Sequence, residues 1–588
     1  GQQVFQLFGG KYMSLEILEY KYTHTVTEAT TGYFSCEPQG VENFDAALAR
    51  LEAAPMDDFL HQHLLRRLGA ASLEQLRSRL PEALGTDGTP GRPVLAALLL
   101  ECAMLNAAQA PLADAFPPNA AEELARHTPL IPLRWSRLAD GPAHRAWSAV
   151  FAANLSGHHV LPRPDEEEMP PLYTPELSTA EGDVPSIADI HARLAATPGA
   201  PRERPPAQET AARALELLVD NGIVAGVEMR HEASLSPIAL LRPWNLDIAV
   251  RNGSLNYTLR GQATAYGRGL SVAEARASYA MEMVERASAY ATVEKGAVVG
   301  LTRAAPLIRA RYSELTAQGR AALDPNELPL EVPYADQPLH WLEARAAGDG
   351  ACVLAPAQAV YLFCNLDEQA LQSAAGSTGL ASGNTLEEAK AAALTEILER
   401  DAEATMPYHR SRCFTLRCRD KRLQSLLDDY AARGIHVQFQ DLTTEFGVPC
   451  YQCFVLGPKG QVARGTGAGL CGPRAALAAL TETPYPYPNG GPSGPGLRGL
   501  PERILEELPD YRLESPARNL QLLEMLLAEH GRRPLYVELT REDLEFPVVR
   551  AIVPGLELTA EPDGFSRIRP RLFRNYLKLF VEQELVHK

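Results

Sequence analysis

Residues 267–286, GRGLSVAEARASYAMEMVER, have a near copy at residues 383–400, GNTLEEAKAAALTEILER. Both segments open on a glycine-containing turn and share the pattern E-A-x6-E-x2-E-R. A third segment, GAGLCGPRAALAALTE at residues 467–482, keeps the alanine and, after six intervening residues, the glutamate. Self-similarity of this kind is typical of a repeated supersecondary unit. Because short strands alternate with these helical segments, the sequence predicts a repeated strand–turn–helix unit.

The polar residues of both copies form stripes when the segments are placed on a helix of about 3.6 residues per turn. In the second copy the stripe spans an arc of about 120° and consists of Asn384, Glu388, Glu396 and Glu399. In the first copy it consists of Ser278, Glu282 and Glu285. Apolar residues occupy the opposite side of each helix. We therefore expect two helices that each present carboxylates in line.

A solvated surface is the common explanation for a single glutamate-rich helix. Like charges three or four residues apart repel, however, and solvated helices usually relieve the repulsion with lysines. The two segments contain only one lysine, Lys390. Carboxylates that face each other across a cleft need a cation, and Mg²⁺ with phosphate oxygens suits an all-oxygen site. The repeat therefore favours a shared site for Mg²⁺ and phosphates.

Composition excludes several other classes of protein. The chain has 588 residues and a net charge of −17, which disfavours a dedicated nucleic-acid binder. It contains no run of about eighteen apolar residues, so no membrane span is expected. Its nine cysteines are scattered, as in reduced cytoplasmic proteins. Cys413/Cys418 and Cys450/Cys453 have a loose zinc-like spacing, but residues 448–456 are typical of a buried strand.

The chain divides into three parts by composition. Residues 14–36 alternate in the manner of short strands, and the following hundred or so residues have helical periodicity. A segment rich in proline, glutamate and aspartate then begins near His158 and is expected to be a linker or a wrapping segment. We expect an α-rich N-terminal domain at 1–157, the linker at 158–206, and an α+β domain at 207–588.

Other nucleotide motifs are absent or incomplete. The chain lacks GxxxxGK[ST], which excludes a P-loop. Gly467-x-Gly469-x-x-Gly472 matches GxGxxG and follows a predicted strand, but no acidic residue for a ribose stands about twenty residues later. A Rossmann dinucleotide site is therefore not expected. There is also no GxSxG elbow and no HExxH motif.

The repeated segments resemble motifs of the YcaO family. G-R-G-x-S-x-x-E-A-x-x-S-x-x-x-E-x-x-E-R at 267–286 resembles the first ATP motif of that family, and S-G-N-T-x-x-E-A-x6-E-x-x-E-R at 382–400 resembles the second. V-R-x-I-V-P-G-L-E at 549–557 is similar to its C-terminal strand. The resemblance covers roughly residues 205–588. It implies stacked α/β subdomains that bind Mg·ATP between glutamate-bearing helices.

The resemblance also implies roles for individual residues. The Mg²⁺ ligands and catalytic glutamates would be Glu282, Glu285, Glu396 and Glu399, and Arg550 would join them as a catalytic residue facing the triphosphate. The ATP contacts would be Ser278, Arg286, Asn384, Glu388, Arg400, Glu482 and Arg204. Arg202 competes with Arg204 for the place of the early basic residue.

Three features depart from the family pattern, and one of them is the early basic residue, for which only Arg202 and Arg204 are candidates. The third helix of the family carries ExxQ, whereas here Glu482 is followed by Tyr485 and by prolines that end the helix. Azoline-forming members end in a PxPxP tail, whereas this chain ends in VEQELVHK. An internal Pro484-x-Pro486-x-Pro488 is more simply a proline-rich loop.

The implied activity is Mg-ATP-dependent O-phosphorylation of a peptide backbone amide. Its product would be an azoline, a thioamide or a related modification of a ribosomally made peptide or protein. One alternative is a nucleotide-binding accessory protein for methylthiolation of a ribosomal protein, and another is an ATP-dependent ligase or kinase for a small molecule. Expected partners are the peptide or protein substrate and a protein for substrate delivery or sulfur transfer, with a homodimer left open. Neither nucleic acid nor membrane is expected, and the expected location is the cytoplasm.

Overall fold

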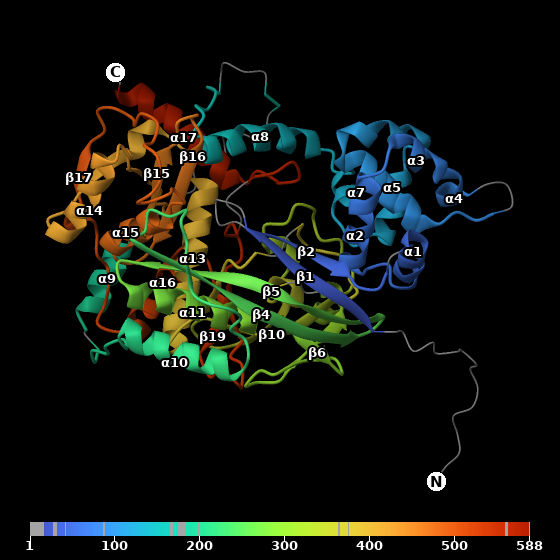
Figure 1. Ribbon diagram of the computed structural model, residues 1–588, viewed down its shortest axis with the longest axis horizontal. Coiled ribbons are helices and arrows are strands. Elements are labelled where there is room, and N and C mark those ends of the chain that lie inside the picture. The colour runs from blue at the N-terminus through green and yellow to red at the C-terminus, as the bar shows by residue number, and fades with distance from the viewer. Residues whose placement is uncertain are drawn as a thin grey trace, which may run out of the picture.

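Three β-sheets and the helices between them make up the protein, which we describe from a computed structural model (Figure 1). The structure describes residues 17–26, 32–41, 43–85, 89–164, 169–170, 172–173, 184–197, 199–362, 365–373, 376–558 and 562–586. Parts of the predicted linker, including residues 174–183, lie outside these ranges. The mixture of sheets and helices confirms the predicted α+β class.

The first sheet is built around a long antiparallel hairpin, β4 (Ile238–Asn252) and β5 (Leu255–Gly269). Its strand order is β2-β1-β5-β4-β6-β7-β8, and β3 pairs with β4. The remaining strands are β1 (Leu18–Val26), β2 (Gly32–Pro38), β3 (Met229–Arg230), β6 (Thr292–Glu294), β7 (Ala297–Val299) and β8 (Ala305–Pro306). Strand β1 runs parallel to β5, so the beginning of the chain belongs to a sheet of the C-terminal part.

The other two sheets are formed by later parts of the chain. The second has the order β11-β10-β18-β19-β12, with β9 paired to β10. Its strands are β9 (Ile308–Ala310), β10 (Leu339–Ala346), β11 (Cys352–Pro356), β12 (Leu380–Ser382), β18 (Leu535–Glu538) and β19 (Val548–Ile552). The third has the order β16-β15-β14-β13-β17. Its strands are β13 (Cys413–Arg417), β14 (Gln438–Asp441), β15 (Cys450–Leu456), β16 (Val462–Ala468) and β17 (Glu502–Ile504).

Each sheet contributes one strand that turns directly into a helix. Strand β5 is followed by α11 (Val272–Ala289), β12 by α13 (Leu386–Thr405), and β16 by α15 (Gly472–Glu482). Side chains cap the first two helices, because Ser271 accepts from the backbone of Glu274 and Thr385 accepts from that of Glu388. The third helix ends at Glu482, as the following proline predicts. Helix α13 runs through the centre of the molecule (Figure 1).

Glycines allow the strand and the helix of two units to touch. A Cβ atom on Gly267 would lie 1.9 Å from the carbonyl oxygen of Ala275, and one on Gly467 would lie 2.3 Å from that of Ala475. Both carbonyls belong to residues eight positions after the glycine. The two units therefore share the same close approach, for which any side chain would be too large.

The helices α1 to α8 form the N-terminal part. They are α1 (Phe44–Ala53), α2 (Asp58–Gly69), α3 (Leu73–Ser78), α4 (Leu80–Leu84), α5 (Pro93–Leu105), α6 (Ala120–Leu124), α7 (Pro132–Trp135) and α8 (Gly141–Gly157). Helix α5 is buried over most of its length. Helix α8 extends from this group toward the C-terminal helix α17 (Pro570–Val586), where Trp147 lies edge-on to Phe573 (Figure 1). A domain boundary at residue 157, which we retain as a proposal, would separate these helices from the rest, although strands β1 and β2 belong to the first sheet.

The remaining helices cover the sheets. They are α9 (Ile187–Ala195), α10 (Ala207–Asp220), α12 (Tyr312–Ala317), α14 (Lys421–Ala432) and α16 (Pro516–Glu529). Short 3-10 helices are η1 (Ala107–Ala115), η2 (Ala125–His127), η4 (Pro325–Glu327), η5 (Ala357–Ala359), η6 (Arg410–Arg412) and η7 (Leu505–Glu507). Helix α9 buries Ile187, Ile190 and Leu194 in the core that α13 and α16 share. The described end of the predicted linker therefore wraps the C-terminal part.

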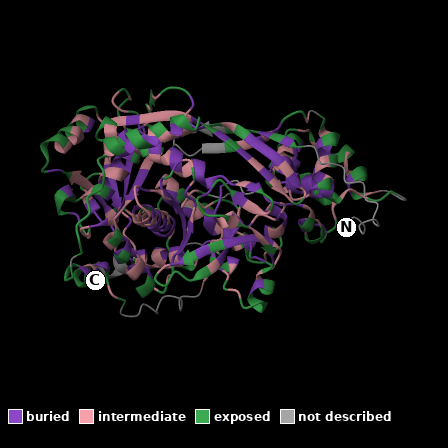
Figure 2. Cartoon of the chain, turned by 90° about the horizontal axis from the view of Figure 1, so that it is seen from below, coloured by how far each residue is buried: buried purple, intermediate pink, exposed green. Residues whose placement is uncertain are grey.

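Buried residues line the contacts between helices and sheets, whereas exposed residues follow the outer surface (Figure 2). A continuous core joins the first and second sheets and reaches the N-terminal helices. A second core lies around α13 and α16, and a third lies within the last sheet. Helix α13 packs against strands of the second sheet and against β16 of the third, which places its polar stripe between sheets.

Candidate functional site

The glutamates of α11 are held by backbone and by a neighbouring arginine. Glu282 Oε2 accepts a hydrogen bond from the backbone N–H of Tyr266 at 2.8 Å. Glu285 Oε1 accepts from Arg286 Nη1 at 2.6 Å, and Arg286 Nε lies 3.9 Å from Glu282 Oε1. The side chain of Glu285 is only 16% exposed. The two carboxylates are thus fixed on either side of one guanidinium.

The glutamates of α13 repeat this arrangement. Glu396 Oε2 accepts from the backbone N–H of Gly379 at 3.2 Å, and Glu399 Oε2 accepts from that of Ala468 at 2.8 Å. Arg400 Nη2 lies 3.3 Å from Glu399 Oε1, and the same guanidinium also pairs with Glu403. The contact to Ala468 joins α13 to β16 of the third unit. In each helix the Glu-Arg pair of the repeated motif is therefore an ion pair.

The two stripes act on one another electrostatically. Burial raises the pKa of Glu285 to about 8, the charges of Glu396 and Glu282 add to the shift, and Arg286 and Arg550 oppose it. Burial also raises the pKa values of Glu282, Glu396 and Glu399. Buried carboxylates with raised pKa values are costly to ionise without further positive charge beside them, which is the condition that favours bound cations.

The third helix adds a further carboxylate to the cluster. Glu482 is exposed at the end of α15, yet its charge contributes to the raised pKa values of both Glu282 and Glu399. Tyr485, which stands where the repeat would place its second glutamate, is buried in the core of the third sheet. The third unit therefore brings one acid to the site instead of two.

The residues present fit Mg²⁺ ions shared with phosphates. Within the described ranges, no three His, Cys, Asp or Glu side chains form a cluster that could hold a metal ion by themselves. Mg²⁺ is usually bound by one or two carboxylates together with waters and substrate phosphate oxygens. The paired glutamates of α11 and α13 offer such partial coordination. The same finding gives no support to a zinc site at the cysteines.

A second polar group surrounds the start of α13. Arg204 Nε lies 3.2 Å from Glu388 Oε1, and Glu388 Oε2 accepts from the backbone N–H and the side-chain amide of Asn384. Thr210 Oγ donates to Asn384 Oδ1 at 3.1 Å. Of the two arginines considered from the sequence, the structure brings Arg204 to Glu388. Asn384 precedes the N-cap Thr385, so it lies before the helix and not within the helical stripe.

The guanidinium of Arg550 is bound to backbone carbonyl groups and does not point freely at a phosphate site. It is 4% exposed, and it donates to the carbonyl oxygens of Val360, Thr378 and Gly376 at 3.0, 2.6 and 2.9 Å. Burial lowers its pKa to about 10, while the charges of Glu396 and Glu285 act in the opposite direction. Arg550 therefore lies close to the acidic stripes but directs three N–H groups to backbone. Its contact with a triphosphate stays a proposal.

Ser278 is the predicted residue with the least structural support. It lies on α11 one turn before Glu282 and is exposed. The position is on the side of the stripe, but no hydrogen bond within the described part of the chain fixes its hydroxyl. Its contact with ATP also stays a proposal.

Three residues that the sequence analysis did not single out belong to this region. Arg268, in the GRG turn before α11, has a buried Nε without a hydrogen-bond partner among the described residues, and its charge opposes the rise in the Glu282 pKa. Thr210 orients Asn384. Asp401 is fully buried on the apolar side of α13. A charged residue among apolar ones on a helix indicates a buried ion pair, and this signal in the sequence could have identified Asp401.

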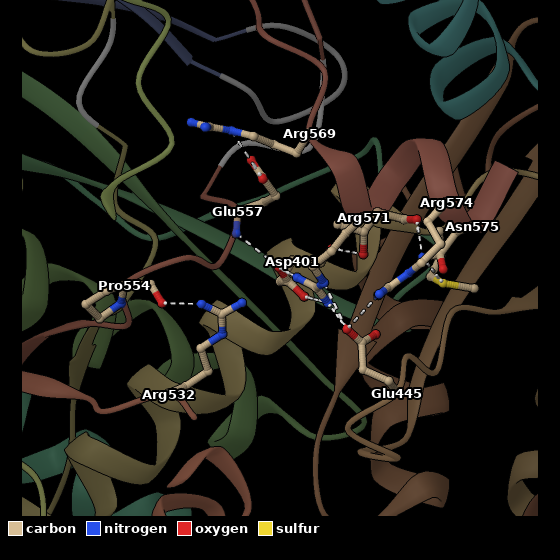
Figure 3. A network of polar contacts seen from close by, with 11 residues as sticks. Asp401, Glu445, Arg532, Pro554, Glu557, Arg569, Arg571, Arg574 and Asn575 are labelled. Atoms are coloured by element: carbon tan, nitrogen blue, oxygen red, sulfur yellow. Dashed lines mark hydrogen bonds and ion pairs between the residues drawn. The ribbon is translucent and has the colours of Figure 1, made fainter. Parts of the chain in front are cut away.

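Asp401 joins α13 to the C-terminal helix (Figure 3). Arg571 of α17 donates to both Asp401 oxygens, at 2.5 and 2.8 Å, and to Glu445 at 2.8 Å. The backbone N–H of Glu557, after strand β19, donates to Asp401 Oδ1 at 3.0 Å. Arg569 Nε lies 3.5 Å from the Glu557 carboxylate. The network fixes the helix that carries Glu396 and Glu399 against the turn that follows β19.

Within the described ranges, no helix combines the length and the apolar character that crossing a bilayer requires.

Comparison with known proteins agrees with the motifs. A family model described as "YcaO cyclodehydratase, ATP-ad Mg2+-binding" matches residues 266–484 and 492–557. This range contains α11, α13, α15 and strand β19, and so it covers every glutamate of the site.

Relatives and solved structures are similar over parts of the chain. An uncharacterized protein of Methanothermobacter thermautotrophicus is 29% identical over 338 residues, which cover 51% of this chain and 84% of that protein. An uncharacterized protein in the tfuA 3' region of Rhizobium leguminosarum bv. trifolii is 25% identical over 299 residues, which cover 44% of this chain and 67% of that protein. A heterocyclase in complex with substrate and cofactor is 18% identical with a TM-score of 0.47, and the match covers 64% of this chain and 57% of that one.

Proposed function

Since residues 266–484 and 492–557 belong to the YcaO family, we propose that the chain is an ATP-dependent enzyme that modifies the backbone of a ribosomally made peptide or protein. The observation that supports this most strongly is the pair of equivalent glutamate helices, α11 and α13. The Glu396 charge raises the pKa of Glu285, and Arg286 acts on both. Carboxylates that act on each other electrostatically support a site shared by the two helices.

In the proposed site each side chain has a binding or positioning role. Glu282, Glu285, Glu396 and Glu399 hold Mg²⁺, and Arg286 and Arg400 orient the adjacent glutamates while adding positive charge for phosphates. Mg²⁺, when bound by these glutamates, would supply positive charge that offsets the charge of the phosphates. Arg204 and Asn384 hold Glu388 at the start of α13, where the contacts to the nucleotide are proposed. The guanidinium of Arg268, whose charge acts on Glu282, would add further positive charge beside the phosphates.

The proposed reaction activates a backbone amide. An amide oxygen is weakly nucleophilic, so its phosphorylation depends on positioning and on neutralised phosphate charge more than on a strong protein base. The amide oxygen takes the terminal phosphoryl group of ATP and ADP leaves. A nucleophile then loses its proton and bonds to the amide carbon, and the C–O bond breaks so that phosphate leaves with the former amide oxygen and the amide nitrogen gives up its proton where an azoline forms. A side-chain thiol or hydroxyl would give an azoline, and an external sulfur donor would give a thioamide.

The N-terminal helices are proposed to recognise the substrate or a partner protein. Helices α1 to α7 lie on one side of the molecule, apart from α13, whereas α8 reaches toward the C-terminal part (Figure 1). A partner for peptide delivery or sulfur transfer and a homodimer are both compatible with this arrangement. The supply of ATP would place the reaction in the cytoplasm.

A direct test uses the purified full chain, Mg·ATP and the short peptides encoded beside its gene. Phosphate release that requires the peptide is expected, together with a peptide that has lost one water or exchanged one oxygen for sulfur by mass spectrometry. Both signals should be lost in Glu396→Gln. ATP binding without turnover of any peptide would instead support an accessory protein, and phosphorylation of a metabolite would support a small-molecule kinase or ligase.

A further inference from the structure

A cavity of about 570 Å³ lies where the N-terminal helices meet the C-terminal part. Part of the lining comes from α2, the end of α5 and the start of α7, and the rest comes from Leu328, residues 358–359 and 365–373, Asp563 and Phe565. Its volume is within the range typical of ligand sites, about 300–1,000 Å³. The cavity is separate from the glutamate helices, since none of their residues lines it.

Most of the wall is apolar. Its large hydrophobic side chains are Phe34, Phe59, Leu65, Leu105, Leu130, Ile131, Leu328, Leu371 and Phe565. Phe34 and Leu105 are 42% and 45% exposed. Such surfaces at the junction of two parts of a chain are favourable places for an apolar ligand.

Most of the polar residues of the wall are satisfied by other protein groups. Glu368 lies 2.7 Å from His340 Nδ1 and accepts from Gln358 Nε2 at 2.7 Å. Asn365 donates to Asp57 at 2.9 Å. The guanidinium of Arg66 lies 2.6 Å from Glu37. These groups need no further ligand.

Asp58 differs from them because no ion pair among the described residues neutralises its carboxylate, and the charge of Arg66 acts on it only from farther away. It is the first residue of α2, and both oxygens accept only from the neutral amide of Gln62, at 3.0 and 3.1 Å, within the described part of the chain. Burial raises the pKa of this carboxyl. A carboxylate in a mainly apolar wall is costly without a positive charge beside it, and a cationic ligand would remove that cost.

We propose that this cavity binds a short apolar stretch of the peptide substrate that carries a lysine or arginine, whose charged end contacts Asp58. The proposal rests on the proposed function for the choice of a peptide. The charge preference comes from the wall itself, where Asp58 and Asp563 are acidic and the guanidinium of Arg66 is already paired with Glu37. The net charge of −17 would also attract a basic peptide toward the chain.

Binding of two synthetic pentapeptides to the full chain tests this assignment. The probes are acetyl-Gly-Leu-Lys-Phe-Gly-amide and its glutamate counterpart acetyl-Gly-Leu-Glu-Phe-Gly-amide, titrated calorimetrically without ATP. The lysine peptide should bind the unaltered protein at least about tenfold more tightly than the glutamate peptide, which is the size expected for a charge-assisted contact. Asp58→Asn should abolish this preference.

Two further variants make the result specific. Glu74→Gln removes an exposed acid from the nearby helix α3 and should leave the preference intact. Ala359→Trp fills the cavity and should weaken both peptides, and unfolding midpoints check that each variant is folded. Equal affinity for the two peptides, no binding of the lysine peptide at millimolar concentration, or a preference retained in Asp58→Asn would overturn the proposal.

The same titrations separate this proposal from the proposed function. Because they contain no ATP, peptide binding should persist in Glu396→Gln. A protein that binds the lysine peptide but never consumes ATP would contradict the proposed reaction and leave the cavity assignment standing. ATP consumption that requires a peptide, with no preference for the lysine probe, would do the reverse.

Discussion

The backbone N–H of Ala468 donates to the Glu399 carboxylate at 2.8 Å, so a strand of the third sheet holds a glutamate on the helix of the second unit. A comparable contact runs from the backbone of Tyr266 to Glu282 within the first unit. The glutamates are thus oriented by the edges of strands as well as by arginines. Hydrogen bonds of this kind position a carboxylate before any cation binds.

Replacing Arg204 should weaken ATP binding without removing the activity. Its guanidinium contacts Glu388 but is 61% exposed, and an exposed ion pair contributes about 1 kcal/mol or less. Arg204→Gln should therefore raise the KM for ATP by up to about fivefold and leave kcat nearly unchanged. Arg202→Gln is the matched control and should behave as the unaltered protein. Equal effects of the two substitutions would contradict the assignment of Arg204.

The glycines at the strand–helix contacts should not tolerate a methyl group. Gly267→Ala and Gly467→Ala would place Cβ against helix backbone, which cannot move as a flexible side chain can. We expect each to lower the free energy of unfolding by about 1–3 kcal/mol. Gly564→Ala, where a Cβ meets open space, serves as the control in the same denaturant titration. Unchanged midpoints for the first two variants would show that the contact is looser than described.

Breaking the Asp401–Arg571 pair should destabilise the protein strongly. Asp401 is fully buried, and loss of one partner from a buried ion pair costs about 3–5 kcal/mol. Asp401→Asn and Arg571→Met should each lower the unfolding midpoint in urea. The double variant should lose less than the sum of the two, because neither charge is then left alone. Strict additivity would indicate that the two side chains do not interact.

Acid should destabilise the protein partly through His158. Its ring stacks on Tyr408 at 3.8 Å, and burial lowers its pKa to about 4 from 6.5. The unfolded chain therefore binds more protons than the folded one between these values, so stability rises with pH across this window and is lost as the pH falls. His158→Asn suits the positive φ of 55° and should reduce the slope of stability against pH. His159→Gln, at an exposed neighbour, should keep the slope.

The sequence predicted the features that depend on local pattern. The three strand–helix units, the early end of α15 and the strand before Pro554 all follow from periodicity and from the positions of glycine and proline. The predicted start of α13 at Asn384 was wrong by two residues, because the helix begins at Leu386, directly after the cap Thr385. Helix ends depend on side-chain caps, which periodicity alone does not locate.

Features that depend on distant contacts could not be predicted in this way. Arg204 and Arg202 differ only in which one reaches Glu388, 184 residues from Arg204 along the chain. The parallel pairing of β1 with β5 crosses more than two hundred residues, and no local pattern specifies it. The backbone carbonyls that hold Arg550 belong to a loop whose path is set by packing. Chain topology, and not residue type, decides each of these.

The central claim is that the glutamates of α13 hold Mg²⁺ and ATP. Calorimetric titration of Mg·ATP into the unaltered chain, Glu396→Gln, Glu399→Gln and the control Glu387→Gln tests it most directly. Glu387 lies in the first turn of the same helix, so its replacement changes the charge of α13 equally. The account predicts Mg²⁺-dependent binding that Glu396→Gln and Glu399→Gln each weaken at least about tenfold and that Glu387→Gln leaves unchanged. Equal binding by all four proteins would contradict it.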